Sequence, residues 1–367
     1  MTDGESLANW LRLTLIPGIG GQTQRKLLSV FGLPDAVFSA GSTALRAAAG
    51  DKAAGLLLDT NNDAEIATAI AWAKGENQHI VTLADSEYPQ ALLEMADPPT
   101  LLYVRGRLDL LNQPTIAIVG SRNPTPQGSR NAQAFAATLA QAGLVVASGL
   151  ALGVDAAAHR GALSVGGRTV AFIGTGIDRI YPARNRELAH EIGSKGAIVS
   201  EFPLGTPVLA SNFPRRNRLI SGISRAVLVV EAATESGSLI TARLAAEQGR
   251  DVFAIPGSIH SPQSRGCHQL IKQGAKLVDS ARDILEEYQH VTPCDRTVAP
   301  AVTSQEPALP SEERILEQMG YDSCCLDELL VRTGMTAEAL SVILLQLELE
   351  GQVARLPGNR FQRMATG

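Results

Sequence analysis

Short apolar runs rich in valine and isoleucine alternate with helix-length segments from Thr115 onward. Runs of this length that are apolar on both faces are typical of strands in a sheet covered by helices on both sides. Six runs fit this pattern, namely Thr115–Val119, Leu144–Ala147, Thr169–Ile173, Ala197–Val199, Ala226–Val230 and Asp251–Ile255. The segment Lys276–Val278 is a candidate edge strand. The alternation with helices predicts an α/β domain with a doubly wound parallel sheet, which we place at residues 81–288.

The first 80 residues follow a different pattern. Apolar positions recur there with helical spacing, and no strand-like run comes before Leu101–Val104. We therefore expect residues 1–80 to form a separate small helical domain.

The chain beyond Tyr288 divides into a linker and a third domain. Residues 289–310 contain four prolines and no apolar periodicity, which is typical of an extended linker. A capping-box pattern, two further helical patterns and a candidate hairpin then follow at Ser311–Gln318, Leu326–Arg332, Ala337–Glu350 and Gln352–Met364. Three short helices and a hairpin predict a winged-helix domain at residues 311–367.

Composition limits the kinds of partner that the chain can attract. Its 367 residues are 45% hydrophobic, which is enough for two or three domains with sizeable cores. The 32 basic and 37 acidic residues give a net charge of −5, so any site for an anion such as nucleic acid must be local. Asp3 and Glu5 stand where a signal peptide carries positive charge, and no apolar run approaches the roughly 18 residues of a membrane span. We expect a cytoplasmic protein that makes no membrane contact.

No metal and no cofactor are expected. The four cysteines form no CxxC pair and have no histidine at ligand spacing, which disfavours a zinc site and a disulfide framework. A nicotinamide site needs the glycine pattern GxGxxG, which is absent after Val119, while Gly174–Arg179 has an arginine at the third glycine position. The acidic residue expected near the end of the second strand is missing as well, because Ser148 and Gly149 stand there.

The turn after the first predicted strand contains Gly120, Ser121 and Arg122, and a helix is predicted from about Gly128. In doubly wound sheets, ligands bind beyond the carboxyl ends of the strands, where backbone N–H groups at helix N-termini face an anion. A phosphate cradle fits this turn. So does a tight turn in which Arg122 only hydrogen-bonds a neighbouring carbonyl.

Arginines collect after two later strands. They are Arg184, Arg186, Arg215, Arg216 and Arg218. The last three lie in a stretch, Phe202–Val230, that contains no Asp or Glu. Guanidinium groups bind phosphate in a bidentate way that lysine cannot copy. We expect these side chains to form, with Arg122, a row of phosphate partners, and we expect Arg122, Arg215 and Arg216 to face solvent. A solvated surface without a ligand is the alternative.

Two smaller features allow a structural and a functional interpretation. Ser236, Gly237 and Ser238 are expected to cap a helix over Leu239–Gly249, and the N-terminus of that helix can also hold an anion. Asp155 and His159 lie four residues apart, so a helix places them on one face. Spacing ties no serine or cysteine nucleophile to them, so a structural Asp–His hydrogen bond is favoured over a general-base pair.

A series of distinctive motifs covers nearly all of residues 115–279. In order, they are Val119–Arg122 (VGSR), Ser148–Leu163 (SGLALGVDAAAHRGAL), Gly174–Asn185 (GTGIDRIYPARN), Ser200–Gly205 (SEFPLG), Phe213–Gly222 (FPRRNRLISG), Val229–Ala245 (VVEAATESGSLITARLA), Val252–Gly257 (VFAIPG) and Gly266–Val278 (GCHQLIKQGAKLV). They resemble the DNA-processing protein A family (DprA/Smf). The resemblance implies an extended Rossmann-like core that binds single-stranded DNA and loads the RecA recombinase during natural transformation, without an established catalytic activity.

The resemblance also implies site residues. The DNA-contacting basic pocket of the family corresponds here to Arg122, to Arg184 or Arg186, and to Arg215, Arg216 and Arg218. With the glycines and serines of the two turns described above, the candidate DNA-binding residues are Gly120, Ser121, Arg122, Arg184, Arg186, Arg215, Arg216, Arg218, Ser236, Gly237 and Ser238. A homodimer is implied through His268, Ile271 and Leu277 at the margin of the sheet. Simple covering of the core by the apolar side chains there is the alternative.

The outer domains are less specific. Leu15–Gly21, followed by Arg25 and Lys26, is similar to a helix-hairpin-helix turn, in which glycines let backbone N–H groups approach a phosphate. Family members carry a sterile-alpha-motif-like domain in this region, and a plain tight turn is the alternative. Residues 311–367 contain five arginines and nine acidic residues, a net charge of −4. The candidate recognition helix Thr336–Glu350 has no basic residue, so we expect a protein-interaction or regulatory module.

An enzyme is the competing hypothesis. It is a nucleotide-handling Rossmann hydrolase of the lysine-decarboxylase-like group, which hydrolyses nucleoside monophosphates and carries a PGGxGTxxE signature. The nearest turn here, Glu235–Thr241 (ESGSLIT), lacks the paired glycines and the downstream glutamate. A non-catalytic DNA-binding protein is therefore favoured.

Overall fold

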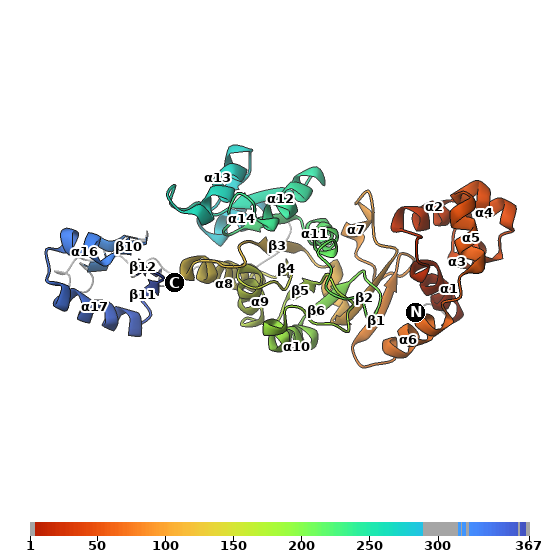
Figure 1. The fold of residues 1–367 in the computed structure, drawn as a ribbon, viewed down its shortest axis with the longest axis horizontal. Coiled ribbons are helices and arrows are strands. Elements are labelled where there is room, and N and C mark those ends of the chain that lie inside the picture. The colour runs from red at the N-terminus through yellow and green to blue at the C-terminus, as the bar shows by residue number, and fades with distance from the viewer. Residues whose placement is uncertain (1–3, 289–314, 317, 321–322, 359, 365–367) are drawn as a thin grey trace.

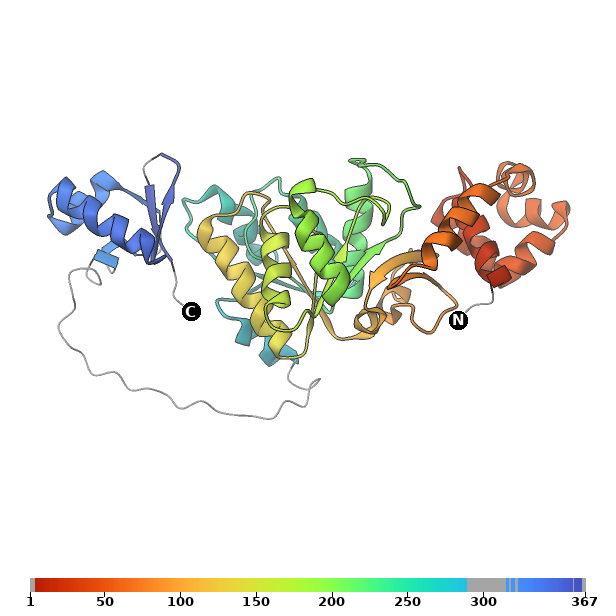
Figure 2. The ribbon, with the colours of Figure 1, turned by 90° about the horizontal axis from the view of Figure 1, so that it is seen from below.

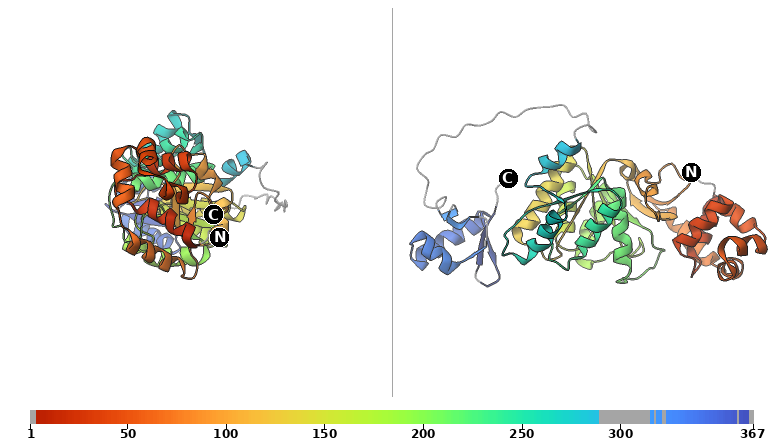
Figure 3. Two further views of the ribbon diagram at one scale, coloured as in Figure 1. Left: turned by 90° about the vertical axis from the view of Figure 1, so that its right-hand side faces the viewer. Right: turned by 90° about the horizontal axis from the view of Figure 1, so that it is seen from above.

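The computed structural model describes residues 4–288, 315–316, 318–320, 323–358 and 360–364. Within these residues the molecule is elongated, with a helical segment at one end, an α/β core in the middle and a small module at the other end (Figures 1 and 2). Figure 3 shows the same three parts in line when the molecule is viewed from above.

The N-terminal segment is helical, as predicted. Its helices are α1 (Gly4–Leu15), α2 (Gly21–Phe31), α3 (Pro34–Ser39), α4 (Ser42–Ala49), α5 (Asp51–Asp59) and α6 (Asp63–Ala73). Leu13, Ile16 and Leu27 belong to a small apolar core of this segment. Trp10 of α1 instead packs in a cluster with Tyr103 of the sheet, so the segment is anchored on the α/β core.

In the described part of the chain, nine strands form one sheet in the order β1-β2-β6-β5-β4-β3-β7-β8-β9. They are β1 (Gln78–Thr82), β2 (Leu101–Gly106), β3 (Thr115–Val119), β4 (Val145–Ser148), β5 (Thr169–Phe172), β6 (Ala197–Ser200), β7 (Ala226–Val229), β8 (Asp251–Ala254) and β9 (Lys276–Leu277). Strands β3 to β9 pair in parallel, while β1 and β2 add an antiparallel margin beside β6. The six predicted strands and the edge strand are confirmed.

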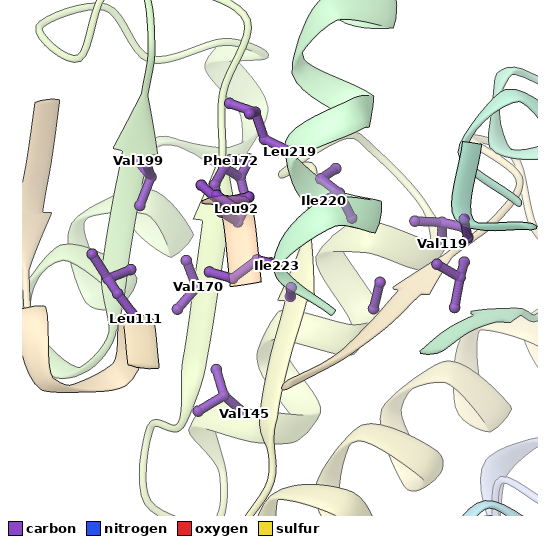
Figure 4. Packing of buried hydrophobic residues seen from close by; sticks show 14 of the residues in the cluster. Leu92, Leu111, Val119, Val145, Val170, Phe172, Val199, Leu219, Ile220 and Ile223 are labelled. Atoms are coloured by element: carbon purple, nitrogen blue, oxygen red, sulfur yellow. The ribbon is translucent and has the colours of Figure 1, made fainter. Parts of the chain in front are cut away.

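Helices cover both faces of the sheet. One face carries α7 (Gln90–Leu93), α11 (Asn212–Ile223), α12 (Gly237–Glu247) and α13 (Arg265–Lys272). The other carries α8 (Pro126–Gln141), α9 (Val154–Leu163), α10 (Arg186–Lys195) and α14 (Ala281–Tyr288). Figure 4 shows Leu219, Ile220 and Ile223 of α11 in one apolar cluster with Val170 and Phe172, which share a face of β5 because side chains alternate along a strand.

The order of strands creates a switch point at β3. From β3 the chain proceeds through β4, β5 and β6 on one side, and helix α11 then returns it to β7 on the other side of β3. The connections that leave β3 and β7 therefore diverge to opposite faces, which opens a crevice at the carboxyl ends of these two strands.

The C-terminal module is a winged-helix domain, as predicted. It contains α16 (Leu326–Thr333), α17 (Ala337–Leu349) and a three-stranded sheet ordered β10-β12-β11, with β10 (Cys324–Cys325), β11 (Val353–Leu356) and β12 (Arg360–Arg363). Leu329, Leu340, Leu344 and Phe361 belong to its apolar core. The predicted linker and most of the first predicted helix lie outside the described residues. Across the described ranges, no helix is long and apolar enough to cross a membrane.

Candidate nucleic-acid interface

A cavity of about 430 Å³ lies at the carboxyl ends of β3 and β7, and we call it the switch-point cavity. Its walls are the turn after β3, the first turns of α11 and the turn that leads into α12. The predicted residues that line it are Gly120, Ser121, Arg122, Arg216, Ser236, Gly237 and Ser238. The fold therefore brings together, at the place where doubly wound sheets bind ligands, two turns that are more than 100 residues apart in sequence.

The turn after β3 is tightly packed. A Cβ atom on Gly120 would lie 2.8 Å from Cγ2 of Val154 and 2.9 Å from the carbonyl oxygen of Glu231, so the close approach requires glycine. The Ser121 amide donates to the Glu231 carbonyl at 2.6 Å, and the Ser121 carbonyl accepts from the Val154 amide at 3.1 Å. Ser121 is consequently buried, and the next residue, Arg122, is exposed on a fixed backbone.

Arg122 is an exposed cation beside aromatic rings. No described carboxylate lies within salt-bridge distance of its guanidinium. The guanidinium carbon lies 5.9 Å from the centroid of the Phe213 ring, and that ring is 5.9 Å from the half-exposed ring of Tyr181. A cation next to aromatic faces suits a phosphate and an unstacked base.

The expectation that Arg216 faces solvent is wrong. Its residue exposure is only 5%. The Nη1 group donates to the Phe172 carbonyl at 2.6 Å and also to the Gly149 carbonyl. Burial lowers the pKa of Arg216 to about 10, although the nearby Asp155 carboxylate opposes this shift. Arg216 therefore holds the ends of β4 and β5 together at the floor of the cavity.

Asp155 is the counter-charge of Arg216. Its Oδ2 accepts from the amides of Gly149 at 3.2 Å and Ala151 at 3.3 Å. Burial raises the pKa of Asp155, and the Arg216 charge opposes that rise. A Cβ atom on Gly149 would overlap both charged groups, at 2.4 Å from Nη1 of Arg216 and 2.8 Å from Oδ2 of Asp155. Only glycine at position 149 lets the two charges approach each other.

The predicted hydrogen bond between Asp155 and His159 is not formed. His159 is fully buried, and its Nδ1 lies 2.7 Å from the hydroxyl of Thr169, which itself donates to the Val146 carbonyl at 2.8 Å. Because the Thr169 hydroxyl uses its hydrogen in the bond to the Val146 carbonyl, it can only accept from His159, so Nδ1 carries the imidazole proton. Burial lowers the pKa of His159 from 6.5 to about 3, so the ring is neutral and structural.

Protein stability should fall in mild acid because of His159. Between pH 6.5 and about 3 the unfolded chain binds a proton that the folded chain rejects, so the unfolding free energy decreases as the pH falls through this window. We expect a loss of about 1 kcal/mol between pH 6 and pH 5 from this residue, measured by denaturant unfolding. His159→Gln should remove that part of the pH dependence, whereas replacement of the exposed His190 by Gln should retain it. Equal slopes in all three proteins would contradict the assignment.

Arg218 is also mostly buried. Its side chain is 13% exposed, its Nη2 pairs with Oε2 of Glu201, and its Nε lies 3.3 Å from Oδ2 of Asp97. Arg215 is exposed at 59%, 3.8 Å from the same Glu201 oxygen, with its guanidinium carbon 5.0 Å from the centroid of the Phe202 ring. Arg215 and Arg218 line a second cavity on the other side of the first turn of α11.

The last two predicted arginines stand apart from both cavities. Arg184 in η2 (Ala183–Asn185) and Arg186 at the start of α10 are exposed and line neither cavity. Asn185 between them is buried and donates to the carbonyls of Leu150 at 2.9 Å and Ala151 at 3.1 Å. This anchor fixes the loop next to the turn that holds Asp155.

The N-terminus of α12 lines the same cavity as Arg122. The Ser236 hydroxyl accepts from the Ser238 amide at 3.3 Å, which confirms the predicted cap. The first turn of α12 has no acidic residue, so its N–H groups and dipole favour an anion in the cavity. Glu235, at the start of this turn, also lines the cavity.

The residues predicted for a dimer lie at the β9 edge. His268 Nε2 contacts the Gly257 carbonyl at 2.9 Å, and Ile271 packs half-buried against the core. Leu277 is 49% exposed on the edge strand. Cys267 and Leu270 are buried, so the covering of the core accounts for these two side chains but not for Leu277.

Several other residues that line the switch-point cavity were not predicted as site residues, among them Asn123, Phe213 and Asn217. Asn123 and Asn217 are polar side chains next to predicted arginines, so the sequence offers no separate signal for them. Phe213 precedes the arginine run, and its place beside the guanidinium of Arg122 depends on the packing of α11 against the sheet.

Comparisons with known proteins agree with this description. Residues 79–289 match the family model described as DNA recombination-mediator protein A, and residues 299–359 match the DprA winged helix domain. The chain is 45% identical over 299 residues to protein Smf of Escherichia coli, with 80% of this chain and 79% of that protein covered.

Two solved structures are similar to the chain. DNA processing protein A (DprA) of Streptococcus pneumoniae is 38% identical with a TM-score of 0.69, and the match covers 76% of this chain and 97% of that chain. A structure that concerns the single-stranded DNA binding mode of DNA processing protein A from Helicobacter pylori is 32% identical with a TM-score of 0.53. That match covers 57% of this chain and 96% of the other chain.

Proposed function

The chain belongs to the DNA recombination-mediator protein A (DprA/Smf) family, and on this basis we propose that it binds single-stranded DNA at the switch-point cavity and delivers it to the RecA recombinase in natural transformation. The observation that carries the proposal is Arg122, an exposed guanidinium without a described carboxylate partner, held on a tightly packed turn in the cavity that the N-terminus of α12 also lines. A phosphate between them would meet a bidentate donor and a helix dipole of the right sign.

The same geometry supports binding without base-specific contacts. Phe213 and Tyr181 offer ring faces beside the phosphate site, and every base has a face that can stack on them. Arg184, Arg186 and Arg215 are exposed outside the switch-point cavity, and we propose that they contact the backbone of the strand beyond it. We propose that binding is dominated by the backbone, with a weak sequence preference.

The polar side chains beneath the switch-point cavity favour a binding role over the hydrolysis of nucleotides, because they are buried and hydrogen-bonded within the protein. The Asp155 carboxylate is occupied by two backbone amides and the Arg216 charge, and His159 is buried in a separate hydrogen bond. Neither group is presented as a base to a bound ligand. We therefore propose a non-catalytic protein.

Binding to single strands in a salt series tests the proposed function. The full chain should bind labelled oligothymidylate more tightly than a duplex of the same length, and log K should fall with log salt by about 0.7 for each phosphate contact. Equal affinity for the duplex, or binding that does not change with salt, would contradict the proposal. Hydrolysis of a nucleoside monophosphate by the same preparation would support the enzyme hypothesis instead.

We propose the delivery of DNA to RecA because the chain belongs to this family, and we propose a homodimer through the β9 edge on the same basis.

Leu277→Asp should convert a dimer into a folded monomer, since a carboxylate on an exposed edge strand disturbs an isologous contact without entering the core. Light scattering would report the mass and circular dichroism the fold. Val30→Asp, at an exposed position of α2, is the matched control and should remain dimeric. A Leu277→Asp protein that stays dimeric would exclude this edge as the interface.

A further inference from the structure

The second cavity lies between the N-terminal helices and the sheet, and its volume is about 1110 Å³. The first turn of α11 separates it from the switch-point cavity. Phe213 and Arg216 line the switch-point cavity, whereas Pro214 and Arg215, between them in sequence, line the second cavity. A ligand that crosses this one helical turn therefore reaches both cavities.

The N-terminus of α2 opens into the second cavity. The N-cap residue Gly20 makes no side-chain cap, and the first turn of this 11-residue helix has no acidic residue. Gly20 and Gly21 both line the cavity, so little side-chain bulk covers the first backbone N–H groups, which have no partner within the helix. The dipole of α2 makes this end favourable for an anion. The turn is the one whose sequence is similar to a helix-hairpin-helix motif.

Two arginines supply positive charge near this helix end. Arg25 donates to the Pro98 carbonyl at 3.1 Å and has no carboxylate partner among the residues that the structure describes. Arg215 is largely exposed, and its Nη2 lies 3.8 Å from Oε2 of Glu201. The two carboxylates in the cavity wall, Asp97 and Glu201, are both paired with Arg218. The charged side chains of the wall thus leave one positive charge in excess.

Buried polar atoms without partners gather in the same wall. Within the described ranges, the Thr100 hydroxyl, the Tyr103 hydroxyl and Oε1 of Glu201 have no hydrogen-bond partner. Thr100 is 3% exposed, Tyr103 is 2% exposed, and all three residues line the cavity. An unsatisfied buried polar group is costly, so three in one cavity point to a ligand with donors and acceptors of its own.

We propose that the second cavity holds one nucleotide of the single strand that passes over α11, with its phosphate at the N-terminus of α2 and its base edge against Thr100 and Tyr103. The inference rests on the proposed function, because the strand must first occupy the switch-point cavity. A phosphate between Arg25 and Arg215 meets two guanidiniums and the helix dipole. A base edge supplies both the acceptors and the donors that the unpaired hydroxyls and the Glu201 oxygen require.

The test compares oligothymidylates of increasing length in fluorescence anisotropy. Arg25→Ala and Thr100→Val should each weaken the binding of long oligonucleotides by about fivefold to tenfold, because each removes one contact to the strand. Both variants should bind the shortest oligonucleotide that the wild-type protein retains with unchanged affinity, since that ligand fills only the switch-point cavity. Lys26→Ala, which removes a charge from an exposed position of the same helix, should behave as the wild-type protein.

Thr100→Val separates a ligand contact from a structural role. Valine has the shape of threonine, and the lost hydroxyl has no described partner, so the Tm should stay the same or rise while the affinity for long strands falls. A lower Tm with unchanged affinity would overturn the inference.

The remaining outcomes distinguish this inference from the proposed function. Wild-type affinity at every length in both Arg25→Ala and Thr100→Val would overturn the second site and leave the proposed function intact. An equal loss in Lys26→Ala would reduce the effect to bulk charge and would also overturn it. Saturable binding of free thymidine monophosphate or inorganic phosphate that depends on Arg25, without any length effect on oligonucleotides, would replace the strand by a free nucleotide. No binding of any single strand by the wild-type protein would overturn both proposals.

Discussion

Replacement of Arg216 by alanine should lower the unfolding free energy of the α/β core by about 3–5 kcal/mol. The truncation leaves the buried Asp155 carboxylate without its counter-charge. It also leaves the carbonyls of Gly149 and Phe172 without their guanidinium donor, and these carbonyls stand at the ends of β4 and β5. Denaturant unfolding followed by circular dichroism would measure the loss.

The neighbouring Arg215 provides the matched control. Its side chain is 59% exposed, so Arg215→Ala should change the unfolding free energy by less than about 0.5 kcal/mol. The double variant Asp155→Leu with Arg216→Met should be more stable than Arg216→Ala, because no uncompensated charge remains buried. Similar small effects for Arg215 and Arg216 would show that the buried charge pair does not hold the strand ends.

The parallel part of the sheet could be predicted because its strands are buried on both faces. A run such as Thr115–Val119 must be continuously apolar to contact helices on both sides, and it stands out against its polar surroundings. Strand β1 was missed for the opposite reason. It pairs with β2 alone at the margin of the sheet, only Val81 and Thr82 in it are buried, and its first residues are polar.

The arginine run could be found from the sequence, but the direction of each side chain could not. Arg215, Arg216 and Arg218 lie on one helix, where successive residues are rotated by about 100°, so Arg216 points away from the face that Arg215 and Arg218 share. Arg215 faces solvent, Arg216 points into the sheet beneath the switch-point cavity, and Arg218 points to Glu201. A local excess of charge predicts a site, whereas the choice between a ligand contact and a buried counter-ion depends on how α11 packs.

The partner of Asp155 could not be predicted from the sequence either. Its spacing to His159 correctly indicates a shared helix, α9, but not which partner each side chain selects. The partner of Asp155 lies on α11, far away in sequence, whereas that of His159 lies on β5, the next strand along the chain. Pairing between elements that are far apart in the chain is decided by the strand order around β3.

Replacement of Arg122 by alanine should weaken single-stranded DNA binding by about 1–3 kcal/mol, which corresponds to roughly a fivefold to hundredfold loss of affinity. Arg122 is the exposed cation of the switch-point cavity, and its side chain makes no contact on which the fold depends. The unfolding free energy should therefore change little, in contrast to Arg216→Ala. Arg122→Lys should give an intermediate affinity, since lysine keeps the charge but loses the bidentate geometry.

The salt dependence of the same variants separates a phosphate contact from a general loss of charge. Arg122→Ala should make the slope of log K against log salt shallower by about 0.7, the contribution of one phosphate on a single strand. Arg168→Ala is the control. Arg168 is equally exposed but directly precedes β5, at the amino ends of the parallel strands and on the opposite edge of the sheet, so its loss should leave both the slope and the affinity unchanged. If Arg122→Ala and Arg168→Ala behave alike, the strand does not pass the carboxyl ends of β3 and β7, and the switch-point cavity is not the DNA site.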